Sequence, residues 1–169
     1  MEEYKFTKWK KWVRKWEYRD DLPEIKFPGV YCIAISETDL SGQDFRKDFE
    51  LREEIVYFGM TNHQSLKNRL NQFNLTISQT RWAHGGADRC LNEHRDYEKL
   101  LPNLYYSVYP FESKIDIYDP KYIRTMGDIL KCENYCIAEY TERFNNELPK
   151  FNNPKSPKLP RDLRNKKKE

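Results

Sequence analysis

The chain has 169 residues, of which 34% are charged and 38% are hydrophobic, and its mean hydropathy is -0.99. This length suits one compact domain. There is no run of about 18 apolar residues, which excludes a membrane-spanning helix. The first residues form no apolar secretory signal, so we expect an intracellular, cytoplasmic protein of a prokaryote, phage or virus. The aromatic content of 15% is too high for a disordered chain.

The net charge of +3 is unevenly distributed along the chain. Residues 150–169 include eight basic and two acidic residues, a net charge of +6, so the rest of the chain carries -3. Residues 154–169 contain three prolines and show no apolar periodicity, so we expect an extended, flexible basic tail there. A polyanion is the natural partner of such a tail, although lysine-rich ends also serve simply to keep proteins soluble.

The first predicted element is a helix over about residues 6–18. Its aromatic and apolar side chains recur at intervals of three and four among basic residues, as in a helix packed on a core. These side chains are Phe6, Trp9, Val13 and Trp16.

Two strands come next. Residues 29–36 (GVYCIAIS) have the almost wholly apolar, β-rich composition of a central strand. A polar insertion from Ser36 to residue 54 leads to a second such segment, IVYFGMT at 55–61. The two segments are placed to pair as a long hairpin.

The remaining predicted elements are two helical stretches, a third strand and a long helix. Thr61 and Asn62 are candidate capping residues for the first helix, where apolar side chains recur at helical spacing and Arg69 flanks them. The other elements span residues 87–101 (helix), 104–111 (strand) and 121–146 (helix). Together they predict an α+β domain over residues 1–153, with a small three-stranded, mostly antiparallel sheet flanked by helices.

The four cysteines form no CxxC pair, so free buried thiols are expected. Cys132 and Cys136 would share one face of a helix, but a zinc site would need two further ligands.

Two short motifs and their order point to a family. Gly29-Val30-Tyr31 opens the first strand, Tyr57-Phe58-Gly59 lies in the second, and Arg69 stands on the following helix. His84 and Asn152 come later, on either side of the third strand and the long helix. In this arrangement the chain resembles the GIY-YIG nuclease family, whose two namesake tripeptides occupy adjacent strands and whose first helix carries an arginine.

The resemblance covers roughly residues 28–153 and includes two departures from the family pattern. The polar insertion places the two tripeptides further apart than is usual in the family. Many members also carry a histidine four residues after the helical arginine, where this chain has Phe73. His84 or Lys67 would have to take over that role.

The long helix carries the candidate metal ligand. Its expected apolar face centres on position 133, where a carboxylate is costly unless it is paired or binds a metal. That face consists of Ile123, Met126, Leu130, Ile137, Tyr140 and Phe144. The family pattern, a glutamate with apolar residues three and four positions later, also favours Glu133 over Glu139. Pairing of Glu133 with a basic residue in the core is the alternative.

The resemblance implies a mechanism for phosphodiester hydrolysis. Glu133 would hold one divalent ion, Mg²⁺ or alternatively Mn²⁺. Tyr31 would accept a proton from the attacking water, and Tyr57 would orient the water or the phosphate. Arg69 would stabilise the pentavalent phosphate, and His84 would position water or protonate the leaving group.

Gly59, Lys67 and Asn152 are the expected substrate contacts. The function so implied is a metal-dependent DNA endonuclease of restriction type, with DNA as partner and no organic cofactor. Cutting both strands would require a homodimer. The alternatives are a structure-selective repair or mobile-element nuclease and a non-catalytic nucleic-acid-binding module.

Overall fold

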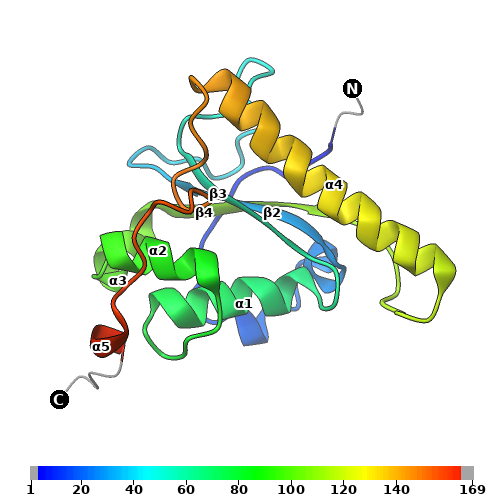
Figure 1. Ribbon diagram of the computed structural model, residues 1–169, viewed down its shortest axis with the longest axis horizontal. Coiled ribbons are helices and arrows are strands. Elements are labelled where there is room, and N and C mark those ends of the chain that lie inside the picture. The colour runs from blue at the N-terminus through cyan, green and yellow to red at the C-terminus, as the bar shows by residue number, and fades with distance from the viewer. Residues whose placement is uncertain (1–3, 165–169) are drawn as a thin grey trace.

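The structure is a computed structural model that describes residues 4–164 (Figure 1). It has an α+β fold around a four-stranded antiparallel sheet with the order β1-β4-β2-β3. The elements, in chain order, are β1 (Lys10–Lys11), η1 (Trp16–Tyr18), η2 (Pro23–Lys26), β2 (Gly29–Ile35), β3 (Ile55–Thr61), α1 (Leu66–Ile77), α2 (Gly85–Glu93), α3 (Tyr97–Leu100), η3 (Leu101–Asn103), β4 (Leu104–Pro110), α4 (Pro120–Arg143) and α5 (Arg161–Arg164).

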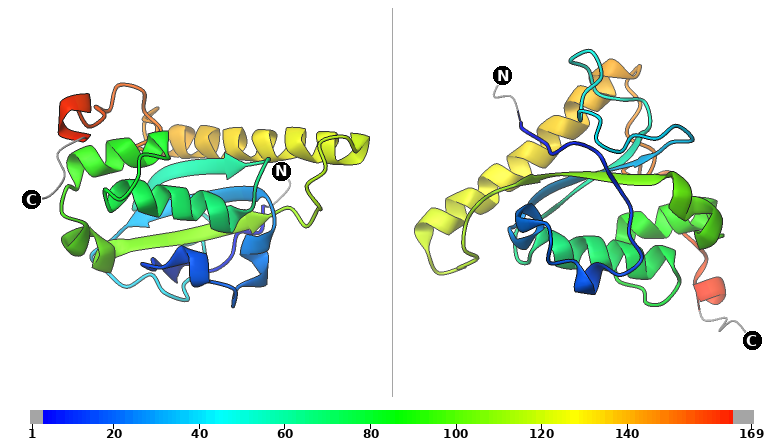
Figure 2. Two further views of the ribbon diagram at one scale, coloured as in Figure 1. Left: turned by 90° about the horizontal axis from the view of Figure 1, so that it is seen from below. Right: turned by 180° about the vertical axis from the view of Figure 1, so that it is seen from behind.

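Helices cover both faces of the sheet, with α1 and α2 on one side and α4 on the other (Figures 1 and 2). The central strand β2 is therefore buried on both faces, which explains its almost wholly apolar sequence. Tyr31 and Ile33 point into the core beneath α1 and α2. Val30, Cys32 and Ala34 point into the core beneath α4. The expected hairpin of β2 and β3 is present.

The N-terminal segment differs from the helix expected at residues 6–18. It is largely extended and runs along the edge of the sheet, where β1 pairs with β4, and only its last residues form the short 3-10 helix η1. The amide of Trp12 donates to the carbonyl of Leu104, 2.9 Å away, and not to a carbonyl one helical turn back. Trp9 packs into the α4 core and Trp12 into the α1 core. The tryptophans thus bury on opposite faces of the sheet, and the helix prediction was wrong.

The sheet has four strands where three were expected, because this short N-terminal strand adds to it. The predicted helix over residues 87–101 is interrupted, since α2 ends at Glu93 and Asp96 caps a new short helix. The N-cap of α1 is Ser65, whose side chain accepts from the amide of Asn68 at 3.2 Å, in place of Thr61 or Asn62.

The buried stripe of α4 is shifted from the one expected. It consists of Tyr122, Ile129, Cys132, Cys136 and Tyr140. Two residues of the expected face are largely solvent-exposed, Ile123 at 52% and Leu130 at 45%. Glu133 lies beside this stripe, partly exposed, and not at its centre.

Two polar segments are packed. In the insertion at residues 36–54, Leu40, Phe45 and Leu51 join the core beneath α4. In the expected flexible tail, Leu159 is buried and Arg164 forms an ion pair, so residues 154–164 are docked on the domain. Residues 165–169 lie outside the described part.

All four cysteines are free and buried, as expected. None of the helices within residues 4–164 has the length and apolar character needed to cross a membrane.

Candidate active site

The candidate site lies at the β3 edge of the sheet, where side chains from both helical layers meet. Tyr31 and Tyr57 come from the paired strands β2 and β3. Arg69 comes from α1 on one face, and Glu133 comes from α4 on the other. Arg69 influences the pKa of Tyr31, Tyr57 and Glu133, so these four groups lie within electrostatic reach of one another.

Two glycines make room for the tyrosine rings, which lie 6.0 Å apart between centroids. A methyl group at Gly59 would lie 2.7 Å from Cε1 of Tyr57 and closer still to the hydroxyl of Tyr31. A methyl group at Gly86 would lie 2.5 Å from Cζ of Tyr57. Gly59 therefore admits a protein side chain at the position where we expected it to admit substrate.

His84 joins the site as the N-cap of α2. Its Nδ1 accepts from the amides of Gly86 and Ala87, at 3.1 and 3.2 Å. Burial, together with the charge of Arg69, lowers the pKa of His84 to about 3, so the ring is neutral at pH 7. A neutral ring that accepts at Nδ1 carries its proton on Nε2, which then donates to Oη of Tyr31, 2.5 Å away.

The tyrosines are protonated at neutral pH. Tyr31 is fully buried, and burial raises its pKa well above the usual value, while the Arg69 guanidinium opposes the shift. Burial also raises the pKa of Tyr57, and the carboxylate of Glu133 adds to this effect. Because Oη of Tyr31 accepts from His84, the phenolic proton of Tyr31 is left to donate elsewhere in the site.

Arg69 is the cationic centre of the site. Its Nη1 donates to Oε1 of Gln72 at 3.0 Å, and Arg69 forms no ion pair with any residue between 4 and 164. Its Nε is buried and has no hydrogen-bond partner among the described residues. A buried guanidinium donor without a partner is uncommon in proteins, so this N–H remains available to a water molecule or an anionic ligand.

Glu133 is the carboxylate of the site. Burial raises the pKa of Glu133, the positive charge of nearby Arg69 opposes this shift, and the resulting pKa is about 7. Glu139 is engaged elsewhere, because both of its oxygens accept from the guanidinium of Arg46, one of them at 2.9 Å. Within residues 4–164 no group of three or more histidine, cysteine or acidic side chains could hold a metal ion. A divalent ion here would take one protein carboxylate and otherwise water and substrate oxygens, which suits Mg²⁺.

Two of the predicted substrate contacts are engaged in other interactions. The ammonium of Lys67 pairs with Asp20 at 2.8 Å. The amide group of Asn152 bonds both the N–H and the carbonyl of Phe58, each at 2.8 Å, and so fixes the centre of β3. Of the two candidates for the missing histidine, it is His84 that contacts Phe73, with 5.0 Å between the ring centroids.

Sequence reasoning missed the part played by Gly86, which follows His84 and Gly85 in the chain. These residues begin α2, where Asp88 in the first turn is the type of residue that favours a helix start. That signal was present in the sequence. The side-chain contact between Gln72 and Arg69 left no comparable signal.

Comparisons of the chain with models of protein families, with curated proteins and with solved structures found no match.

Proposed function

We propose that this protein is a metal-dependent endonuclease that hydrolyses DNA phosphodiester bonds with the machinery of a GIY-YIG nuclease. One observation carries the proposal: Arg69, whose Nε is buried without a partner among the described residues, lies within electrostatic reach of Tyr31, His84 and Glu133. The hairpin of β2 and β3, which aligns Tyr31 with Gly59, supports it as well.

Arg69 would bind the scissile phosphate. A guanidinium presents several N–H donors in one plane, which matches two oxygens of a phosphate and offsets the charge that develops on them during attack by water. The low-polarity surroundings, in which burial shifts the pKa of Tyr31 and of His84, strengthen this interaction relative to water.

Tyr31 and His84 would position the attacking water. His84 holds the Tyr31 oxygen through Nε2–H, which leaves the phenolic O–H of Tyr31 to donate to Tyr57 or to the water. Tyr31 can accept a proton from that water only after losing its own, and its raised pKa makes this unfavourable without further positive charge. His84 stays neutral at pH 7, so it donates a hydrogen bond and is not a general acid in the free protein.

Glu133 would hold the divalent ion, Mg²⁺ or Mn²⁺. Its partly buried carboxylate has no hydrogen-bond donor from the described residues and gains a charge partner when a cation binds. The ion would supply Lewis acidity to the phosphodiester. Because the pKa of Glu133 is about 7, a cation must displace its proton below that pH, and cleavage should increase as the pH rises through 7.

Cleavage of supercoiled plasmid DNA with Mg²⁺ or Mn²⁺ tests the proposal. We expect cleavage by the wild type and a loss of about 10²–10³ in rate for Glu133→Gln. Glu139 is the other carboxylate that the sequence offered as a metal ligand. Glu139→Gln should therefore cut at close to the wild-type rate. Normal cutting by Glu133→Gln together with loss in Glu139→Gln would show that the metal ligand is misassigned.

The products distinguish the kinds of nuclease. Discrete fragments indicate a site-specific restriction-type enzyme, which would act as a homodimer to cut both strands. Nicks or smears indicate a structure-selective repair or mobile-element nuclease. Retention of DNA without cutting at any metal concentration would contradict the catalytic proposal and leave a nucleic-acid-binding module.

A further inference from the structure

A polar pocket adjoins the candidate site at His84. It has a volume of about 550 Å³ and opens between the start of α2 and the docked C-terminal segment. It is lined by Trp82, Ala83, His84, Gly85 and Asp88 on one side and by Lys158, Arg161 and Arg164 on the other.

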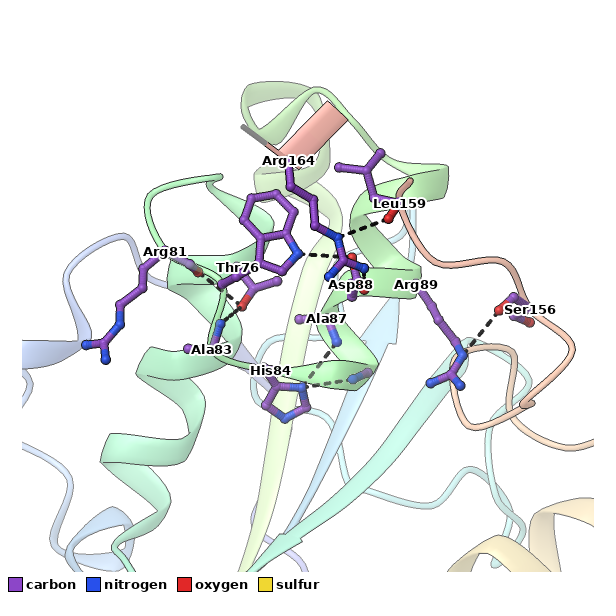
Figure 3. A network of polar contacts seen from close by, with 12 residues as sticks. Thr76, Arg81, Ala83, His84, Ala87, Asp88, Arg89, Ser156, Leu159 and Arg164 are labelled. Carbon is purple, nitrogen blue, oxygen red and sulfur yellow. Dashed lines mark hydrogen bonds and ion pairs between the residues drawn. The ribbon is translucent and has the colours of Figure 1, made fainter. Parts of the chain in front are cut away.

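The acidic residue of this pocket is already neutralised. Asp88 is 3% exposed and accepts from Nε1 of Trp82 at 3.3 Å and from the guanidinium of Arg164 (Figure 3). Arg164 also donates to the carbonyl of Leu159 at 3.1 Å and lies 5.6 Å from the ring centroid of Trp82. Arg164 and Asp88 therefore form the floor of the pocket as a pair.

Two cations remain without such a partner. Lys158 and Arg161 are exposed, and neither forms an ion pair within residues 4–164. With Arg164 offset by Asp88, the lining carries a net charge of +2. A pocket of this charge selects an anion.

The cations are held in place by the packing of the segment that carries them. Leu159, between them, is 4% exposed. Nε of Arg89 on α2 donates to the carbonyl of Ser156 at 3.2 Å, two residues before Lys158 (Figure 3). This anchoring reduces the entropy that each long side chain loses when it binds a ligand.

His84 connects the pocket to the candidate site, because it lines the pocket and also bonds Tyr31. We propose that this pocket binds a backbone phosphate of DNA next to the phosphate held at Arg69. The inference rests on the proposed function for its choice of DNA, and it assigns a specific role to Lys158 and Arg161. The docked C-terminal segment is then part of the DNA-binding surface.

DNA binding by a cleavage-deficient protein tests this inference. Fluorescence anisotropy with a labelled duplex, in Glu133→Gln and without divalent metal, measures affinity between 50 and 200 mM salt. Each phosphate contact contributes about 0.9 to the slope of log K against log salt. Lys158→Ala combined with Arg161→Ala removes the contact with one phosphate, so it should lower the slope by about 0.9 and weaken binding at least tenfold at the lower salt concentrations.

Lys155→Ala is the matched control, since Lys155 is exposed on the same segment but does not line the pocket. It should change the affinity less than twofold. If the double variant binds like this control, the pocket does not bind phosphate. Thermal melting of each variant shows whether the segment is still docked.

The outcomes separate this inference from the proposed function. Pocket-dependent binding by a wild type that never cuts overturns the nuclease and retains the phosphate site. Cutting with pocket-independent binding does the reverse. A wild type that neither binds nor cuts DNA overturns both.

Discussion

His84 and Tyr31 show how one hydrogen bond sets the chemistry of a neighbouring group. Two backbone amides occupy Nδ1 of His84, so the ring proton must reside on Nε2 and point at Oη of Tyr31. The bond leaves Tyr31 with one proton to donate toward the site. The capping of α2 is thereby coupled to the orientation of a candidate catalytic tyrosine.

Gly59 is the residue on which this arrangement depends sterically. Gly59→Ala places a methyl group against Tyr31 and Tyr57, so we expect a loss of about 1–3 kcal/mol in the free energy of unfolding. Gly127→Ala is the control, because nothing lies within 4 Å of a methyl group there and Gly127 lies inside α4. It should gain about 0.5–1 kcal/mol. Urea denaturation measures both, and equal effects at the two positions would contradict the steric account.

At the scale of elements, the N-terminal segment shows what periodicity leaves undetermined. Trp9 and Trp16 recur at helical spacing, yet the chain between them is largely extended and the two rings pack into different cores. The sequence pattern correctly indicated that these rings are buried. It could not reveal that the edge of β4 offers backbone partners that compete with a helix.

The strands and the long helix were predictable because their signals are local. The apolar run at residues 29–36 and the segment at 55–61 became β2 and β3. Tyr31, Tyr57, Arg69 and Glu133 could be chosen as candidate site residues for the same reason, because each was selected from a local motif or from its position on a helix. The engagement of Lys67 with Asp20 and of Asn152 with Phe58 was not, because each contact depends on how segments far apart in sequence pack.

Asn74 on α1 anchors the N-terminal segment to the helical layer. Its Oδ1 accepts from Nε1 of Trp12 at 2.9 Å and from the hydroxyl of Tyr97 at 2.8 Å, and its Nδ2 donates to the carbonyl of Arg14 at 3.0 Å. Asn74→Ala leaves these groups without their partner, so we expect a loss of about 3 kcal/mol in unfolding free energy.

Asn68→Ala is the control for this prediction, since the side chain of Asn68 is exposed on the same helix. It should change the unfolding free energy by less than about 0.5 kcal/mol. Chemical denaturation followed by tryptophan fluorescence suits both variants because Trp12 itself reports on the contact. A small effect of Asn74→Ala would mean that the segment is held by ring packing alone.

At the scale of the whole molecule, the small net charge of +3 is the sum of a basic C-terminal segment and a slightly acidic remainder. The basic C-terminal segment is not a free tail over residues 154–164, because Leu159 and Arg164 dock it beside α2. Two further cations of this segment, Lys158 and Arg161, line a pocket that adjoins the candidate site. The part of the positive charge that residues 158–164 carry is thus presented at a defined place on the surface, close to the groups proposed to act on a phosphate.

Two buried groups of the site make opposite contributions to the pH dependence of stability. The pKa of Glu133 is raised from 4.5 to about 7, so the folded protein retains a proton that the unfolded chain loses, and stability falls as the pH rises between these values. The pKa of His84 is lowered from 6.5 to about 3, so the unfolded chain binds the proton more readily, and stability rises as the pH rises over that interval. Between pH 4.5 and 6.5 the two contributions oppose each other.

Replacing one of the two titrating groups should reveal the contribution of the other to the pH dependence of stability. In metal-free buffer, the unfolding free energy of Glu133→Gln should rise relative to wild type by up to about 1.4 kcal/mol per pH unit between pH 4.5 and 6.5. His84→Asn, which retains a capping side chain, should fall relative to wild type over the same range. Urea denaturation at pH 4.5, 5.5 and 6.5 measures the differences, in which titrating groups common to all three proteins cancel. Parallel profiles for the wild type and both variants would mean that neither group titrates as its burial requires, and the electrostatic account of the site would then be wrong.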